Sequence, residues 1–250
     1  MKKVILLIIL FSINLQLFAG YDISKANNAY QNQEYEKARD FYEELVEKGI
    51  KNFNLFYNLG NTYFKLEEFG LARLFYERAA KFNPLDKDLN FNLELLKSRL
   101  KDKEETKETF LSHIFRKIYY LFSINMLAIF VLICFILIMF TIVLVILANK
   151  SSTEKVIKVF MVILSIFFVI FLIFTIARLH EFYNKNFAVI IDETVFAYSG
   201  PSKDFQQVFT IHEGLKVRID PSADGDKDWV LIKLQSGNGG WIEKEKIKII

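Results

Sequence analysis

Hydrophobic residues follow three different patterns along the chain. Within residues 21–100 they recur at intervals of three and four, which predicts amphipathic helices. Two stretches, 124–147 and 159–177, contain no charged residue, and as helices they would span about 36 Å and about 28 Å. From residue 186 onward apolar and polar positions alternate, which predicts short strands. The sequence therefore predicts a multidomain membrane protein with an all-α part, a two-helix transmembrane hairpin and a small all-β part.

The all-α part contains an internal repeat. The segments YEKARDFYEEL and FGLARLFYERA align at an offset of 34, so that Ala38 meets Ala72 and Tyr42 meets Tyr76. A helical period of this length, with small residues at helix crossings and aromatic residues between them, resembles the tetratricopeptide repeat, which stacks into an α-solenoid. The consensus positions are occupied by Ala38 and Tyr42 in the first copy and by Gly60, Tyr63, Ala72, Tyr76, Ala79 and Pro84 in the second.

The first copy departs from the second, and a further helix follows them. Tyr30 lies one position out of register, which predicts a turn one residue shorter than in the second copy. After Pro84, four leucines on one face predict a capping helix, so that residues 21–100 hold two repeats and a cap. The groove of such a solenoid is lined by the first helix of each repeat, and the predicted groove residues are Asn54, Tyr57, Asn61, Lys65 and Asn92. Asn61 and Lys65 could bind a peptide carboxylate, and the alternative is that they are solvated helix residues.

The membrane part is predicted to have an entry segment and a short loop. Residues 101–122 combine a charged linker with an aromatic and basic stretch that predicts an interfacial helix. The two spans are placed at 123–148 and 158–179, and the lysines of the loop at 149–157 agree with the cytoplasmic side. The charge-free cores of both spans predict an anchor rather than a pump or an ion pathway.

The N-terminal residues 1–20 have the organisation of a secretory signal peptide. Lys2 and Lys3 precede an apolar run, and the small residues Ala19 and Gly20 follow it. A cleaved signal peptide is the main interpretation, and an uncleaved anchor is the alternative. In both cases residue 21 starts outside the cytoplasm, so both soluble parts are predicted on the outer side of the membrane.

Residues 186–250 contain six candidate strands separated by turn-rich pieces, which predicts a small barrel. The segment resembles bacterial SH3-like domains through an SGPS turn, an HEG turn before a strand, a tryptophan that opens a strand, and GWI near the end. The residues that carry this resemblance are Gly200, Pro201, Gly214, Trp229, Gly240 and Trp241. We expect the three glycines to supply turn geometry. We interpret the two tryptophans as barrel core or rim, with a ligand platform as the alternative.

Charge and composition exclude several functions. The formal net charge is only +3 and lysines are interleaved with acids, so no nucleic-acid-binding surface is expected. The only cysteine, Cys134, lies in an apolar run, and His113, His180 and His212 lie in three different regions. The sequence has no phosphate-binding loop, nucleophile elbow or metal-ligand spacing. We therefore expect no catalytic residues, no metal and no cofactor, and hence no enzyme.

The order of the parts suggests a family. A signal peptide, two tetratricopeptide repeats, a two-span hairpin and an SH3-like domain resemble, along the whole chain, BatE proteins of the Bacteroides aerotolerance operon. The resemblance implies a multi-pass inner-membrane scaffold with both soluble domains in the periplasm. Its implied partners are von Willebrand A-domain membrane proteins and, indirectly, a MoxR-type AAA ATPase, in tolerance of oxidative stress. The alternatives are a protein that binds peptidoglycan through the SH3-like domain, and a regulated enzyme or transporter.

Overall fold

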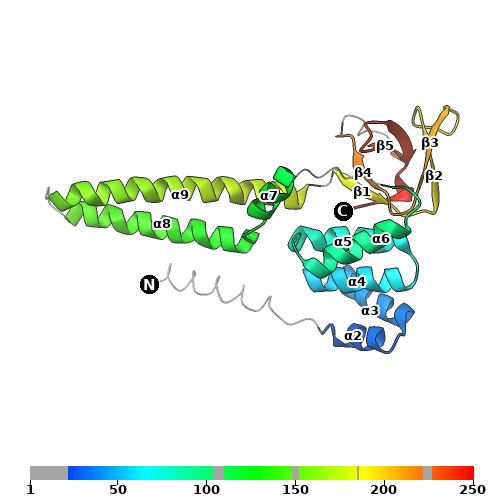
Figure 1. The fold of residues 1–250 in the computed structure, drawn as a ribbon, viewed down its shortest axis with the longest axis horizontal. Helices are drawn as coiled ribbons and strands as arrows, with labels where there is room; N and C mark the ends of the chain where they lie inside the picture. The colour runs from blue at the N-terminus through cyan, green and yellow to red at the C-terminus, as the bar shows by residue number, and fades with distance from the viewer. Residues whose placement is uncertain (1–21, 104–109, 148–151, 185, 222–226) are drawn as a thin grey trace.

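A computed structural model describes residues 22–103, 110–147, 152–184, 186–221 and 227–250. Figure 1 shows a long helical hairpin at one end of the molecule and, at the other, a helical domain beside a β domain. The predicted helical, membrane-hairpin and all-β parts are thus present as three regions. The predicted signal peptide lies outside the described residues, as do residues 104–109 of the linker and residues 149–151 of the loop.

The helical domain consists of five helices in which caps recur at the predicted offset. They are α2 (Ser24–Gln31), α3 (Tyr35–Glu47), α4 (Phe53–Lys65), α5 (Phe69–Phe82) and α6 (Lys87–Arg99). The side chain of Asn52 caps α4 by accepting a hydrogen bond from the Leu55 amide at 2.9 Å. Asp86 caps α6 in the same way through the Leu89 amide, also at 2.9 Å. Each cap satisfies an amide that the helix itself leaves without a partner.

The prediction of a shorter turn in the first copy is wrong. The α2–α3 and α4–α5 turns have the same length, and the corresponding residues Gln33 and Glu67 have positive φ angles of 62° and 61°. The first copy differs in its side chains instead. When the offset is kept unshifted, the small buried Ala29 takes the place of Tyr63.

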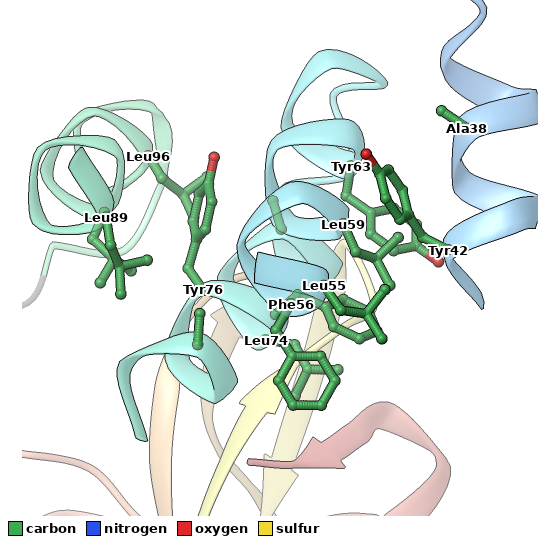
Figure 2. Packing of buried hydrophobic residues seen from close by; sticks show 14 of the residues in the cluster. Ala38, Tyr42, Leu55, Phe56, Leu59, Tyr63, Leu74, Tyr76, Leu89 and Leu96 are labelled. Atoms are coloured by element: carbon green, nitrogen blue, oxygen red, sulfur yellow. The ribbon is translucent and has the colours of Figure 1, made fainter. Parts of the chain in front are cut away.

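The helices pack around a continuous apolar core (Figure 2). Tyr76 lies against α4, where a Cβ atom at Gly60 would approach the Tyr76 ring to 2.5 Å, so this crossing requires glycine. Pro84 follows the end of α5. The other predicted consensus residues are buried, namely Ala38, Tyr42, Gly60, Tyr63, Ala72, Tyr76 and Ala79. A fully buried leucine such as Leu55 or Leu59 contributes about 1.5–3 kcal/mol to the stability of this core.

Two long helices form the hairpin, and a short helix precedes them. They are α7 (Phe110–Tyr119), α8 (Ile124–Leu147) and α9 (Ser152–Tyr183), and both α8 and α9 are long and apolar enough to cross a membrane. Helix α9 begins at Ser152, inside the segment at 149–157 that was predicted to connect the two spans. No glycine or proline interrupts this segment, and Glu154 pairs with Lys158 one turn later at 2.5 Å.

The hairpin turns most of its apolar side chains outward, and its few buried residues include two leucines, Leu127 and Leu164, as well as smaller or polar side chains. Cys134 is buried and unbonded to another cysteine, and Thr141 and Thr175 are also buried in the hairpin. Each threonine hydroxyl donates to a main-chain carbonyl of its own helix, that of Ile138 or Phe171, so neither is left unsatisfied. This polarity pattern is the one that a bilayer requires.

The β domain is a seven-stranded antiparallel sheet in the order β3-β2-β6-β5-β4-β1-β7. Its strands are β1 (Phe187–Ile190), β2 (Thr194–Tyr198), β3 (Gln207–His212), β4 (Lys216–Ile219), β5 (Trp229–Lys233), β6 (Gly239–Glu243) and β7 (Ile247–Ile249). Strand β3 is not among the six strands predicted from the sequence. A register shift between Ala197 and Tyr198 interrupts its pairing with β2, and its exposed and buried residues do not alternate strictly.

Strand β1 belongs to two cores at once. Ala188 and Ile190 lie in the core of the β domain, whereas Val189 between them lies in the core of the helical domain. This explains three consecutive buried residues in a strand of an antiparallel sheet. The β domain is therefore packed directly on the helical domain.

Candidate functional site

Asparagine and tyrosine side chains form a repeated hydrogen-bonded row across the first helices of the repeats, here called the asparagine ladder. The Tyr76 hydroxyl donates to Oδ1 of Asn61 at 2.7 Å, and Nδ2 of Asn92 donates to the same oxygen at 2.9 Å. One repeat earlier, Tyr42 donates to Oδ1 of Asn27 at 2.7 Å and Asn58 donates to it at 3.2 Å. The same pair of hydrogen bonds thus occurs in both repeats. The pair at Asn27 joins α2, α3 and α4, and the pair at Asn61 joins α4, α5 and α6.

The ladder brings together three of the five predicted groove residues. Nδ2 of Asn92 also donates to the Tyr57 hydroxyl at 3.1 Å, so Tyr57, Asn61 and Asn92 form one cluster. Asn54 and Lys65 lie outside it, exposed, about one turn away along α4 on either side. The exposed pair is accessible to a partner, while Oδ1 of Asn61 is already occupied by two donors.

The ladder tyrosines are neutral, with Tyr42 and Tyr76 as donors and Tyr57 as the acceptor of a hydrogen bond from Asn92. Burial raises the pKa of Tyr42 to about 12, although the hydrogen bond from Asn58 acts in the opposite direction. Burial likewise raises the pKa of Tyr57 and of Tyr76. These hydroxyls keep their protons at physiological pH, so the ladder holds its geometry across that range.

Sequence reasoning missed two members of the ladder, Asn27 and Asn58. A signal for them was present, because each precedes a predicted groove asparagine, Asn61 or Asn92, by one repeat length. The repeat was recognised from its aromatic and small residues, and the asparagines that recur at the same offset were not compared.

The opposite side of the helical domain is covered by the β domain through the HEG turn between β3 and β4. The amide of His212 donates to Asp102 at 2.7 Å, and its Nδ1 lies 3.0 Å from the other oxygen of that carboxylate. Glu213 accepts a hydrogen bond from the Gly70 amide at 2.9 Å, at the start of α5. Because α5 has no side-chain cap of its own, Glu213 caps it from the neighbouring domain.

Two glycines allow this close approach. Gly214 has a φ of 79°, as its predicted turn role requires, and a Cβ there would meet Leu100 at 2.4 Å. On the other side of the contact, a Cβ at Gly70 would meet the main-chain oxygen of Ile190 at 2.9 Å. Helix α5 therefore lies against the backbone of β1, and we call this contact the seam.

An ionic cluster fixes the seam further along α5. The Glu77 carboxylate accepts from Nε of Arg73 at 2.8 Å and from Lys216 of β4 at 2.7 Å. Only 2% of the Arg73 side chain is exposed. Burial by itself would raise the pKa of Glu77, but Lys216 and Arg73 outweigh it and lower this pKa to about 2. Nη2 of Arg78 adds a bond to the carbonyl oxygen of Ile249 at 2.7 Å.

The predicted glycines of the β domain have different roles. Gly200 lies in a bend after β2, next to Pro201, and packs under the Phe205 ring. Gly240 is not a turn residue, which corrects the prediction. It lies in β6, where a Cβ would approach that of Ala197 to 2.9 Å, so the need is for close packing between strands.

The two tryptophans lie outside the core of the β domain and flank an aromatic face. Trp241 pairs in register with Tyr198 of the neighbouring strand, and the Tyr198 ring meets Trp229 edge-on at 5.6 Å. Phe196, two residues before Tyr198 on the same strand, is 47% exposed. The core residues of β2, Val195 and Ala197, alternate with these and point to the other side. We call this the aromatic face.

No group of three or more His, Cys, Asp or Glu side chains able to hold a metal occurs within the part of the chain that the structure describes. The chain matches no model of a known protein family and no curated protein sequence. The features of the molecule that bear on its function are the two faces of the helical domain, the aromatic face and the hairpin.

Proposed function

We propose that this protein is a non-catalytic membrane scaffold that holds a partner segment on the first-helix face of a tetratricopeptide-repeat domain. The observation that carries the proposal is that the β domain covers one face of the helical domain and leaves the other face exposed. The α5 side is occupied by the β domain, whereas the side with Asn54 and Lys65 exposes polar groups beside a pre-ordered ladder. A rigid polar face is suited to binding an extended or helical peptide at low ordering cost.

Three recurrences support the repeat assignment. The helix caps, the positive-φ turn residues and the ladder bonds all return after one repeat length. A short antiparallel sheet with an HEG turn and a GWI strand supports the SH3-like assignment of the β domain. Together they favour the BatE-like order of parts, and with it von Willebrand A-domain membrane proteins and, through them, a MoxR-type AAA ATPase as partners.

The membrane assignment draws on the hairpin and on α7. Leu111, Phe115 and Ile118 follow one another along α7 at helical spacing and are exposed, so this helix presents an apolar stripe next to the hairpin. Arg116 and Lys117 on the same helix suit the headgroup region. With the signal-peptide pattern, this favours an inner-membrane protein whose two soluble domains lie in the periplasm.

The test is co-purification of the full-length protein from gently solubilised native membranes. Lys65→Glu reverses an exposed charge on the proposed binding face, and Lys37→Glu makes the same change on the exposed surface of α3. Point substitutions are preferable to deletion of the domain, which would uncover the seam. We expect A-domain proteins and the ATPase with wild type and with Lys37→Glu, and much less of both with Lys65→Glu. Equal recovery from all three would exclude this face as the binding site.

The aromatic face supports a second candidate, binding of peptidoglycan by the β domain. Stacking on exposed aromatic rings is a common way to hold sugar chains, and Phe196, Tyr198, Trp229 and Trp241 are outside the core. Co-sedimentation of the full-length protein with purified sacculi tests it. Loss of sedimentation with Phe196→Ser, but not with Ile249→Ser on β7, which is also exposed, would favour the cell-wall function.

A further inference from the structure

A cleft of about 850 Å³ lies where the helical domain, the β domain and the hairpin meet. In Figure 1, α7 and the end of α9 lie at the end of the hairpin that faces the two soluble domains. Ile124 at the start of α8 and Phe182 in the last turn of α9 line the cleft on the hairpin side. The Phe182 ring packs edge-on against Phe82 of the helical domain at 5.1 Å. The cleft is therefore at the level where the apolar helices end.

The lining of this cleft is strongly cationic. It carries eight arginine and lysine side chains against three glutamates, in a chain whose formal net charge is only +3. One of the three glutamates, Glu77, is shared between Arg73 and Lys216. Arg218 is exposed and has no ion pair among the described residues. Lys97 pairs with Glu94 and Lys233 with Asp220, yet cations still outnumber carboxylates in the lining, and such an excess of positive charge attracts anions.

Arg178 gives the cleft a buried donor with no protein acceptor. Its side chain is 4% exposed, and its Nε has no hydrogen-bond partner within the described part of the chain. Its guanidinium lies 4.2 Å from the centre of the Tyr120 ring and 5.3 Å from that of Tyr119, and its Nη1 is 3.6 Å from Glu181. The stacking fixes the guanidinium plane, and a buried donor without an acceptor normally has a ligand or water as its partner.

We infer that this cleft binds the phosphate headgroup of an anionic phospholipid, with Arg178 and Arg218 among its ligands. A phosphate oxygen is the acceptor that a guanidinium fits best. Ile124 and Phe182 lie where the acyl chains would leave the headgroup and enter the bilayer. The bound lipid would join the two soluble domains to the hairpin, beyond the partner binding proposed above.

The test compares lipid retention by the full-length protein in nanodiscs made of phosphatidylcholine with and without phosphatidylglycerol. Native mass spectrometry of the released protein counts retained phosphatidylglycerol. Arg218→Gln removes one cleft charge without disturbing a buried contact, and Lys248→Gln removes one exposed charge of the same domain outside the cleft. We expect about fivefold weaker retention for Arg218→Gln, about 25-fold for Arg178→Gln with Arg218→Gln, and no change for Lys248→Gln.

Two results would overturn the inference. Equal retention by Arg218→Gln and by Lys248→Gln would show that the cleft is not the lipid site, whether or not the double variant folds. Inorganic phosphate, titrated against the detergent-solubilised protein, distinguishes the source of the anion. If phosphate alone binds with the same dependence on Arg218, and phosphatidylglycerol is retained no better than phosphatidylcholine, the ligand is a soluble anion and not a lipid.

Discussion

The two sides of the helical domain use polar groups in opposite ways. On the α5 side, Glu77, Arg73 and Lys216 are charges whose cluster crosses from one domain to another. On the first-helix side, Asn61 and its neighbours are half-buried neutral groups whose partners come from the repeat domain itself. Ion pairs between two domains hold those domains in one arrangement. A neutral network whose hydrogen bonds all lie within one domain needs no second domain, so its surface can remain exposed to a partner.

This difference agrees with the two roles proposed for the helical domain, which are attachment of the β domain on the α5 side and partner binding on the first-helix side. A buried ion pair is costly to separate because each charge would lose its partner in a place with little water. The seam therefore favours one fixed arrangement of the two soluble domains. The ladder makes no such demand, and the exposed Asn54 and Lys65 beside it remain open to a partner.

The largest expected effect comes from breaking the seam with Glu77→Gln. Arg73, which is 2% exposed, would lose its carboxylate, so we expect a loss of about 3–5 kcal/mol in the free energy of unfolding. Both tryptophans of the chain lie in the β domain, so their fluorescence during urea unfolding in detergent reports on this domain. Glu44→Gln, which removes an exposed and solvent-screened pair with Lys48, should leave the free energy of unfolding nearly unchanged. Similar losses for both variants would contradict a stabilising role for the seam.

The same carboxylate predicts an acid dependence. Because the pKa of Glu77 is lowered from 4.5 to about 2 by folding, its contribution is complete above pH 4.5 and is lost as the pH falls towards 2. The loss amounts to about 3 kcal/mol. Unfolding of wild type and of Glu77→Gln should therefore converge as the pH falls from 4.5 to 2. A constant difference between them across this range would mean that Glu77 is not the titrating group.

The ladder should respond more weakly. Tyr76→Phe removes one hydroxyl that donates to Asn61, and we expect a loss of about 1 kcal/mol in the free energy of unfolding. Tyr42→Phe should cost about the same, because it removes the equivalent bond to Asn27. Tyr35→Phe, whose hydroxyl makes no hydrogen bond within the described residues, serves as the control. An equal decrease in the free energy of unfolding for Tyr35→Phe would show that the ladder hydrogen bonds do not contribute to stability.

The smallest effect concerns the cap that crosses the seam. Glu213→Gln keeps an acceptor for the Gly70 amide but removes the negative charge at the start of α5, which should cost about 0.5 kcal/mol. Hydrogen exchange at the Gly70 amide should then be about twofold faster when it occurs through local opening. Glu193→Gln changes an exposed carboxylate elsewhere in the β domain and should leave this amide unaffected.

Local patterns were enough to predict the three regions. The charge-free run from Ile124 to Leu147 coincides with α8, because an apolar run of this length predicts a membrane-spanning helix. The regular offset between the two copies likewise pointed to paired helices. Helix α9 extends beyond the span predicted at 158–179, because its first turn is charged and gives no apolar signal. Strand β3 was missed because a register shift interrupts its alternation.

Contacts between distant segments could not be predicted in this way. The HEG segment was predicted only as a turn. In the structure His212 binds Asp102, which lies 110 positions earlier in the chain, and Glu213 binds Gly70, which lies 143 positions earlier. Nothing in the local sequence of Gly70 or Asp102 marks them as partners of that turn. The cleft is harder still, since its cations come from two soluble domains and the hairpin, and only the fold assembles them.

We propose that the first-helix face is the partner-binding side of this protein. Site-specific photo-crosslinking in native membranes tests it most directly, with the crosslinker placed either at Asn54 on that face or at Lys37, which is exposed on α3. We expect a discrete crosslinked product from position 54, identifiable by mass spectrometry, and none from position 37. Crosslinking from position 37 alone, or equal products from both positions, would contradict it.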